Sequence, residues 1–196
     1  MKATSTLPEN YNKYYSVDLQ KNKKIAVIIN LLAFVIAIIM VIAGIFINPI
    51  ISFLDTTNGY LPLLARLLCI ALGSIAYIIL HELIHGIAMK ICGTKKIKFG
   101  FTGLYAFAGS NDYYDKKAYI FIALAPVVFW GIILGVLNFL VSEPWFWVVY
   151  IIQIFNISGA VGDYFVTIKF INFPKDILIK DDGVSMTVYS TSPSSK

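Results

Sequence analysis

Four long apolar segments dominate the hydrophobic pattern of the chain, and polar stretches separate them. The apolar segments cover residues 25–47, 67–89, 118–141 and 145–168. Each is long enough to cross the hydrocarbon core of a bilayer as an α-helix, which takes about 20 residues. The pattern therefore predicts an all-α membrane protein with four transmembrane helices.

The polar stretches predict how the chain is oriented. Residues 1–24 form a basic N-terminal arm, residues 25–171 hold the four-span membrane domain, and residues 172–196 form a tail. The arm, the loop between the second and third spans and the tail are rich in lysine, whereas the other two loops hold only Asp55 and Glu143 as charged residues. Because positively charged loops stay in the cytoplasm, both termini are expected there.

The composition also indicates a membrane protein, and it limits the kinds of binding partner to expect. Hydrophobic residues make up 58% of the chain and charged residues 14%, and the mean hydropathy is +0.76. A net charge of +5 would point weakly to nucleic acid in a soluble chain, but here the basic residues set orientation. The expected partners are the lipid bilayer and another membrane protein, with no nucleic acid. Nothing in the pattern indicates an oligomeric state.

Two polar segments carry a β-like alternation. In residues 97–108 large apolar residues alternate with polar or small ones around Thr102-Gly103, which predicts a short β-hairpin on the cytoplasmic side between the second and third spans. Its free edge could pair with an unwound substrate, or the segment could be an amphipathic surface loop with no such role. In the tail, residues 176–180 and 184–189 flank Asp181-Asp182-Gly183 and predict a second small hairpin.

The second span carries the sequence His81-Glu82-Leu83-Ile84-His85. On a helix, His81 and His85 project from one face with the spacing that lets two imidazoles share a Zn²⁺ ion, and Glu82 could take a proton from a water molecule. The alternative is an ordinary helix whose polar residues face solvent and bind no metal. The apolar flanks count against it, because ionisable groups at membrane depth are costly unless they meet a metal, a partner or water.

A catalytic zinc usually takes three protein ligands, and Asp163 is the candidate for the third. The chain has two histidines, and Asp163 is the one further carboxylate inside a predicted span. Counted from Lys90 and Lys169, the lysines that end the two spans, His85, His81 and Asp163 lie roughly 7, 13 and 9 Å deep. The three side chains can therefore meet in one layer. The alternative is that Asp163 pairs with Lys169 or a backbone group.

Three further features surround these residues. Pro126 in the third span should kink that helix and free a backbone carbonyl. Ser158 and Gly162 would let the fourth span pack closely against the second, or unwind locally where it lines a polar cavity. Asn156 could donate a hydrogen bond to a substrate carbonyl or an oxyanion, and a structural bond between helices is an equally good explanation.

With these residues in hand, the chain resembles the intramembrane zinc metalloproteases of the site-2 protease type, and more closely a zincin peptidase family of small bacterial membrane proteins with unknown function. The matching residues are His81 to Gly86 on a transmembrane helix, Ala125-Pro126 after a β-like loop, and Asn156 to Asp163 on a later helix. The resemblance implies that Asp163 is the third zinc ligand and that Asn156 serves the active site. It also implies that the membrane is a bacterial cytoplasmic membrane. The stretch from Asn156 to Asp163 departs from the site-2 protease pattern, because it lacks a proline.

Two functions follow from these predictions. The first is a zinc-dependent intramembrane endopeptidase, in which His81, His85 and Asp163 hold Zn²⁺, Glu82 moves the proton, and the substrate is a transmembrane segment of another protein. The second is a catalytically inactive metal-binding membrane protein that acts as a regulator, partner-capture module or carrier.

Overall fold

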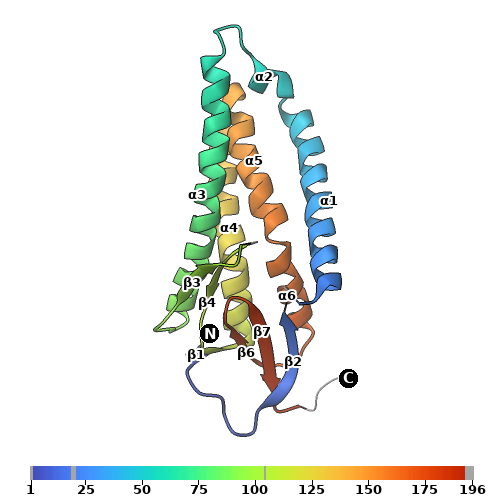
Figure 1. Ribbon diagram of the computed structural model, residues 1–196, viewed down its shortest axis with the longest axis vertical. Coiled ribbons are helices and arrows are strands. Elements are labelled where there is room, and N and C mark those ends of the chain that lie inside the picture. The colour runs from blue at the N-terminus through green and yellow to red at the C-terminus, as the bar shows by residue number, and fades with distance from the viewer. Residues whose placement is uncertain (1, 19–20, 104, 193–196) are drawn as a thin grey trace. The chain divides into compact units, whose positions relative to one another are not determined.

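The computed structural model describes residues 2–18, 21–103 and 105–192, and most of them are helical (Figure 1). The helices are α1 (Lys23–Ile47), α2 (Ile50–Leu54), α3 (Leu61–Ile91), α4 (Lys116–Leu140), α5 (Glu143–Gly159) and α6 (Val161–Ile171). The strands are β1 (Ala3–Thr4), β2 (Asn12–Asp18), β3 (Lys98–Phe101), β4 (Ala106–Gly109), β5 (Tyr113–Asp115), β6 (Leu178–Asp181) and β7 (Ser185–Ser190).

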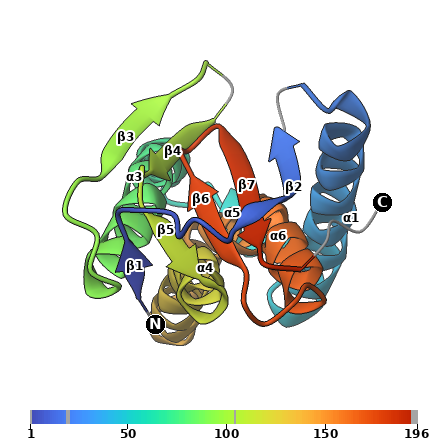
Figure 2. The same ribbon diagram turned by 90° about the horizontal axis from the view of Figure 1, so that it is seen from below.

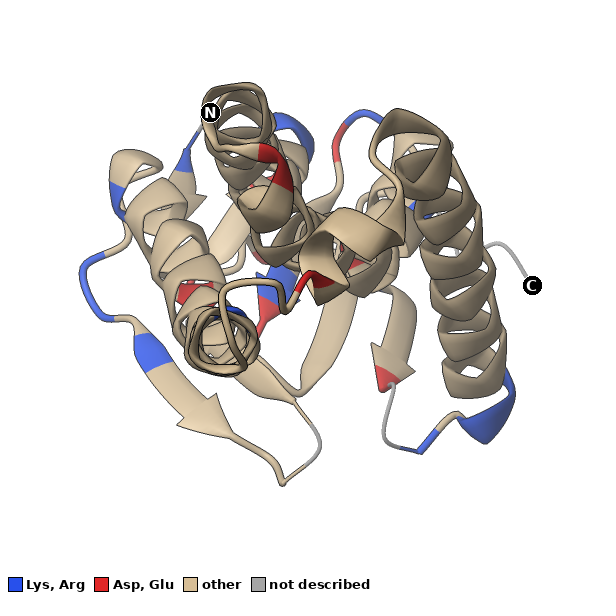
Figure 3. Ribbon diagram, turned by 90° about the horizontal axis from the view of Figure 1, so that it is seen from above, with Lys and Arg blue, Asp and Glu red and all other residues tan. Residues whose placement is uncertain are grey.

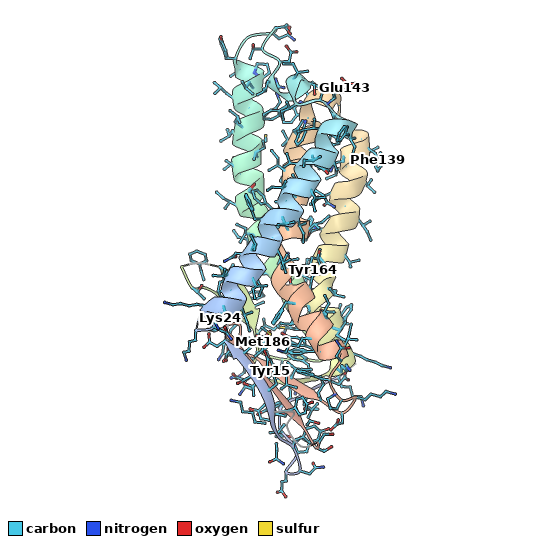
Figure 4. The ribbon with its side chains drawn as sticks, turned by 90° about the vertical axis from the view of Figure 1, so that its right-hand side faces the viewer. Tyr15, Lys24, Phe139, Glu143, Tyr164 and Met186 are labelled. Atoms are coloured by element: carbon cyan, nitrogen blue, oxygen red, sulfur yellow. The ribbon has the colours of Figure 1, made fainter. Side chains whose placement is uncertain are left out.

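Four helical segments in the described part of the chain are long and apolar enough to cross a membrane. They are α1, α3, α4 and the segment Glu143–Ile171, which contains α5 and α6. Many of their large apolar side chains face outward, as Phe139 does at 92% exposure (Figure 4). Figure 3 shows these helices largely tan, with most Lys and Arg in loops or near helix ends. The expectation of four long apolar helices is confirmed, and their orientation stays a prediction.

The chain divides into two compact units. The first, called here the sheet unit, contains Met1–Ile29, Glu82–Pro126 and Gly162–Lys196. The second, called the helical unit, contains Asn30–His81 and Val127–Val161.

The sheet unit is built on a five-stranded antiparallel sheet of order β1-β5-β6-β7-β2 (Figure 2). The predicted tail hairpin is present as β6 and β7, and the predicted hairpin after the second span is present as β3 and β4, which form a separate two-stranded sheet. The prediction of an all-α fold with two hairpins lacked three strands of the larger sheet. The N-terminal arm supplies β1 and β2, and the segment before α4 supplies β5.

The core of the sheet unit packs this sheet against the nearby ends of α3, α4 and α6. Tyr114, Ile179 and Val188 on the strands are fully buried, together with Phe170 of α6. Burying each such side chain stabilises the fold by about 1.5–3 kcal/mol. The sheet therefore holds in place the helix ends that carry Glu82, His85 and Asp163.

The helical unit packs α2 against α5. Phe53 on α2 and Phe146 and Trp147 on α5 form a buried cluster. The indole of Trp147 donates a hydrogen bond to the carbonyl of Asn48 at 3.0 Å. The buried Arg66 donates to the backbone carbonyls of residues 52, 53 and 55, and so satisfies groups that the short α2 leaves open at its end.

The last apolar segment is interrupted at Ala160. Helix α5 ends at Gly159 and α6 begins at Val161. Asp163 therefore lies in the first turn of α6, where the positive end of the helix dipole favours a carboxylate. A continuous helix would have placed the same carboxylate in mid-helix, without this stabilisation.

Candidate metal centre

Helix α3 carries the three residues of the motif. The boundary between the units lies directly after His81, but α3 runs through it without interruption from Leu61 to Ile91. The helix itself therefore places His81 one turn before His85, on the same side.

Asp163 approaches His85 inside the sheet unit. Its Oδ1 lies 3.7 Å from Nε2 of His85, and the two side chains are 23% and 12% exposed. One ligand atom each from His81, His85 and Asp163 lie within 4.8 Å of one another. In a tetrahedral zinc site with bonds of about 2.0–2.2 Å, neighbouring ligand atoms are about 3.3–3.6 Å apart. The 3.7 Å between His85 and Asp163 comes close to these values, and the limit of 4.8 Å for all three atoms is wider than a bound zinc ion requires.

The ring of His85 is oriented by a backbone carbonyl that a proline leaves open. Pro126 has no N–H, so the carbonyl of Ile122, four residues earlier in α4, lacks its usual helical donor. Nδ1 of His85 lies 2.9 Å from this oxygen. A carbonyl can only accept, so Nδ1 carries a hydrogen, and in the neutral ring Nε2, which faces Asp163, carries the lone pair. This is the arrangement in which metal-binding histidines are usually held.

The sheet unit contains a cavity of about 140 Å³ at these residues. Glu82, His85 and Asp163 line it, and the other lining residues come from α3, α4, the β3–β4 hairpin and the β6–β7 hairpin: Met89, Tyr105, Ala106, Phe107, Ala108, Tyr119, Ile122, Ala123, Asp181, Gly183, Val184 and Met186. The cavity therefore brings the expected base and two of the expected ligands together with several apolar side chains.

Two polar residues of this cavity were not among the residues predicted from the sequence. The hydroxyl of Tyr119 donates to Oδ2 of Asp181 at 2.6 Å, and the N–H of Gly183 donates to Oδ1 at 2.9 Å. Burial raises the pKa of the Asp181 carboxyl, while these hydrogen bonds act against the increase. Only the Asp-Asp-Gly turn marked this position in the sequence, and a turn does not reveal which cavity it faces.

The β6–β7 turn fits closely against β4. The carbonyl of Asp181 accepts a hydrogen bond from the N–H of Ser110 at 2.8 Å. Gly183 has a φ of +91°, and a Cβ there would lie 2.1 Å from Cδ2 of Phe107. Only glycine meets both requirements without strain. The tail therefore forms one wall of the cavity.

Asn156 is fully buried in the helical unit, and both polar atoms of its side chain are hydrogen-bonded there. Nδ2 donates to the carbonyl of Val127 at 3.1 Å, and Oδ1 accepts from the hydroxyl of Tyr77 at 2.9 Å. The same hydroxyl lies 2.8 Å from Nδ1 of His81. The structural alternative foreseen for Asn156, a bond between helices, is present. Its contact with substrate stays a prediction.

Comparison with known proteins gives this arrangement a family. A family profile described as "Putative zincin peptidase" matches residues 74–178, more than half of the chain. The chain belongs to this family. The matched region contains His81, Glu82, His85 and Asp163, and the family description supports a zinc-dependent metallopeptidase. The β6–β7 turn of the cavity lies beyond residue 178, outside the match.

One curated relative is similar to this chain over part of its length. The protein called "Uncharacterized 24.7 kDa protein in gap 5'region" from Pyrococcus woesei is 31% identical over 117 residues, which cover 57% of this chain and 50% of that protein. The chain thus spans about half the length of this relative. No solved structure is similar enough to this chain to count as a match.

Proposed function

We propose that this protein is a zinc-dependent intramembrane endopeptidase of the site-2 protease kind, which hydrolyses peptide bonds in transmembrane segments of other membrane proteins. The observation that carries the proposal is the cluster of ligand atoms from His81, His85 and Asp163 on segments apolar enough to span a membrane. Ionisable side chains within a bilayer cost free energy, and where they occur they usually serve a function.

The proposed chemistry assigns one role to each residue. His81, His85 and Asp163 would hold the zinc ion, which when bound polarises a scissile carbonyl and activates a water molecule. Glu82 lines the same cavity as His85 and Asp163, so its carboxylate can take the proton from the attacking water. It would then pass that proton to the leaving amine.

The cavity walls support a peptide substrate. Ala106, Phe107 and Ala108 line the cavity, and they belong to β4. A strand that lines the cavity can align an extended peptide through backbone hydrogen bonds. Phe99 and Phe101 on the partner strand β3 are 55% and 70% exposed, as suits a hairpin at the membrane surface. We propose that cleavage occurs near the cytoplasmic end of the substrate segment, with both termini of the enzyme in the cytoplasm.

The test compares wild type with Glu82→Gln in two measurements. Zinc content is measured on protein purified in detergent, and cleavage is measured in cells that co-express candidate single-span substrates. We expect Glu82→Gln to keep its zinc and to lose cleavage by at least about 100-fold, the usual contribution of a positioned proton-transfer group. Glu143→Gln, the same change at the start of α5, should cleave as wild type does. Equal cleavage by Glu82→Gln would refute the assignment of Glu82. Bound zinc with no cleavage by wild type would favour the inactive metal-binding regulator.

A further inference from the structure

The hydrogen bonds around Asn156 have a fixed direction. The carbonyl of Val127 can only accept, so the atom of Asn156 that lies 3.1 Å from it must be the amide nitrogen. The amide oxygen of Asn156 then faces the hydroxyl of Tyr77 at 2.9 Å. Because that oxygen can only accept, the hydroxyl hydrogen of Tyr77 is directed to it.

The same reasoning reaches the ring of His81. With its hydrogen used on Asn156, the hydroxyl of Tyr77 offers a lone pair to Nδ1 of His81, 2.8 Å away. Nδ1 must therefore be the protonated nitrogen, and Nε2 carries the lone pair. The neutral ring has two tautomers, and the hydrogen bond made by one nitrogen decides which is present.

We infer that Asn156 and Tyr77 are positioning residues that hold His81 in the tautomer with Nδ1 protonated, so that Nε2 is presented to the metal. The inference rests on the metal site of the proposed function and gives Asn156 a role that does not require contact with substrate. Asn156 is 0% and Tyr77 8% exposed, so water does not readily replace the hydrogen bonds that these two side chains make.

Similar hydrogen bonds therefore orient the rings of both histidines. His85 donates to the carbonyl of Ile122 directly, whereas the chain of bonds to His81 starts at the carbonyl of Val127. These two carbonyls belong to α4 and flank Pro126 in the sequence. Loss of such an outer hydrogen bond typically lowers metal affinity about 10- to 100-fold.

The first experiment measures zinc affinity by competition with a chelator in Tyr77→Phe, Asn156→Leu and the double variant. We expect each single variant to bind zinc about 10- to 100-fold more weakly than wild type. Since Asn156 acts through Tyr77, adding Asn156→Leu to Tyr77→Phe should cause no further loss. Tyr150→Phe is the matched control: it removes a hydroxyl that donates to the carbonyl of Met40, and its zinc affinity should equal that of wild type.

A second measurement needs no zinc. The chain has two histidines, so ¹⁵N-histidine labelling of the metal-free protein gives signals from two rings. At a pH where both rings are neutral, their ¹⁵N shifts should report a protonated Nδ1 in each, and Tyr77→Phe should change one ring only.

The outcomes separate the inference from the function. A wild-type His81 protonated at Nε2, or unchanged zinc affinity in Tyr77→Phe and Asn156→Leu, would overturn the inference and leave the zinc site standing. A wild type that binds no zinc, with both rings protonated at Nδ1, would overturn the proposed function and support the tautomer.

Discussion

At the scale of single residues, Pro126 links a feature of the sequence to the candidate site. A proline inside a helix frees the carbonyl four residues before it, and here that carbonyl belongs to Ile122 and accepts from Nδ1 of His85. The residue that interrupts the hydrogen bonds of α4 therefore also orients a proposed metal ligand.

Replacing Pro126 with alanine should separate these two effects. The new N–H would compete with His85 for the carbonyl of Ile122, so we expect zinc affinity to fall by up to about 10-fold. The melting temperature should stay the same or rise, because the helix regains a hydrogen bond. Chelator competition and thermal unfolding measure the two quantities. Pro144→Ala is the control, since this proline lies in the first turn of α5, where its missing N–H has no helical partner anyway. Unchanged zinc affinity in Pro126→Ala would contradict this account.

The sequence predicted some site residues better than others. His81, Glu82 and His85 share one helix, so their relation follows from local geometry. Asp163 followed from depth and from the lack of other carboxylates in the spans, and the structure places it beside His85. The partners of the two Nδ1 atoms depend on how each helix is rotated about its own axis, which apolar segments with little periodicity do not specify.

At the scale of elements, the hairpins could be predicted from the sequence, whereas the pairing of the arm strands in the larger sheet could not. Strands β3 and β4, like β6 and β7, are joined by short turns, so local alternation was enough to predict them. The arm strands pair with distant residues, as in Ala3 with Tyr114 and Lys13 with Tyr189. No local pattern encodes such long-range pairing, and the polar arm gave no apolar face to suggest it.

Because the β6–β7 turn packs closely against β4, we expect Gly183→Ala to lower the stability of the fold more than a glycine-to-alanine change in a turn usually does. Alanine at a positive φ costs about 1 kcal/mol, and the collision with Phe107 should add about 1–3 kcal/mol, as overpacking does. Gly93→Ala is the control, because Gly93 also has a positive φ (+101°), but a Cβ there would meet no atom of the described residues within 4 Å. Thermal unfolding should show a larger loss for Gly183→Ala than for Gly93→Ala.

A second substitution tests the cause of that loss. If the ring of Phe107 is responsible, Phe107→Ala should reduce the extra destabilisation by Gly183→Ala, because it removes the colliding atoms. Equal losses for Gly183→Ala in both backgrounds would instead assign the whole effect to the backbone.

At the scale of the whole molecule, the distribution of basic residues predicts the orientation in the membrane. The segment after α3 contains Lys95 and Lys96, with Lys98 at the start of β3, whereas the loop before α3 contains Asp55 as its one charged residue. Placing the basic loop in the cytoplasm also places both termini there. Since Lys90 follows His85 by five residues and His81 by nine on α3, about one and a half to two and a half turns, this orientation would put the candidate metal site near the cytoplasmic surface.

Labelling of single cysteines in intact cells tests this orientation. The chain has two cysteines, Cys69 on the apolar α3 and the buried Cys92, and both would be replaced by alanine. In this background, Asn58→Cys in the exposed loop before α3 should react with a membrane-impermeant maleimide added to intact cells. Lys95→Cys, exposed in the loop after α3, should react only after the cells are permeabilised. The reverse pattern would place the termini and the candidate site on the outer side, and any substrate would then have to be cut near its outer end.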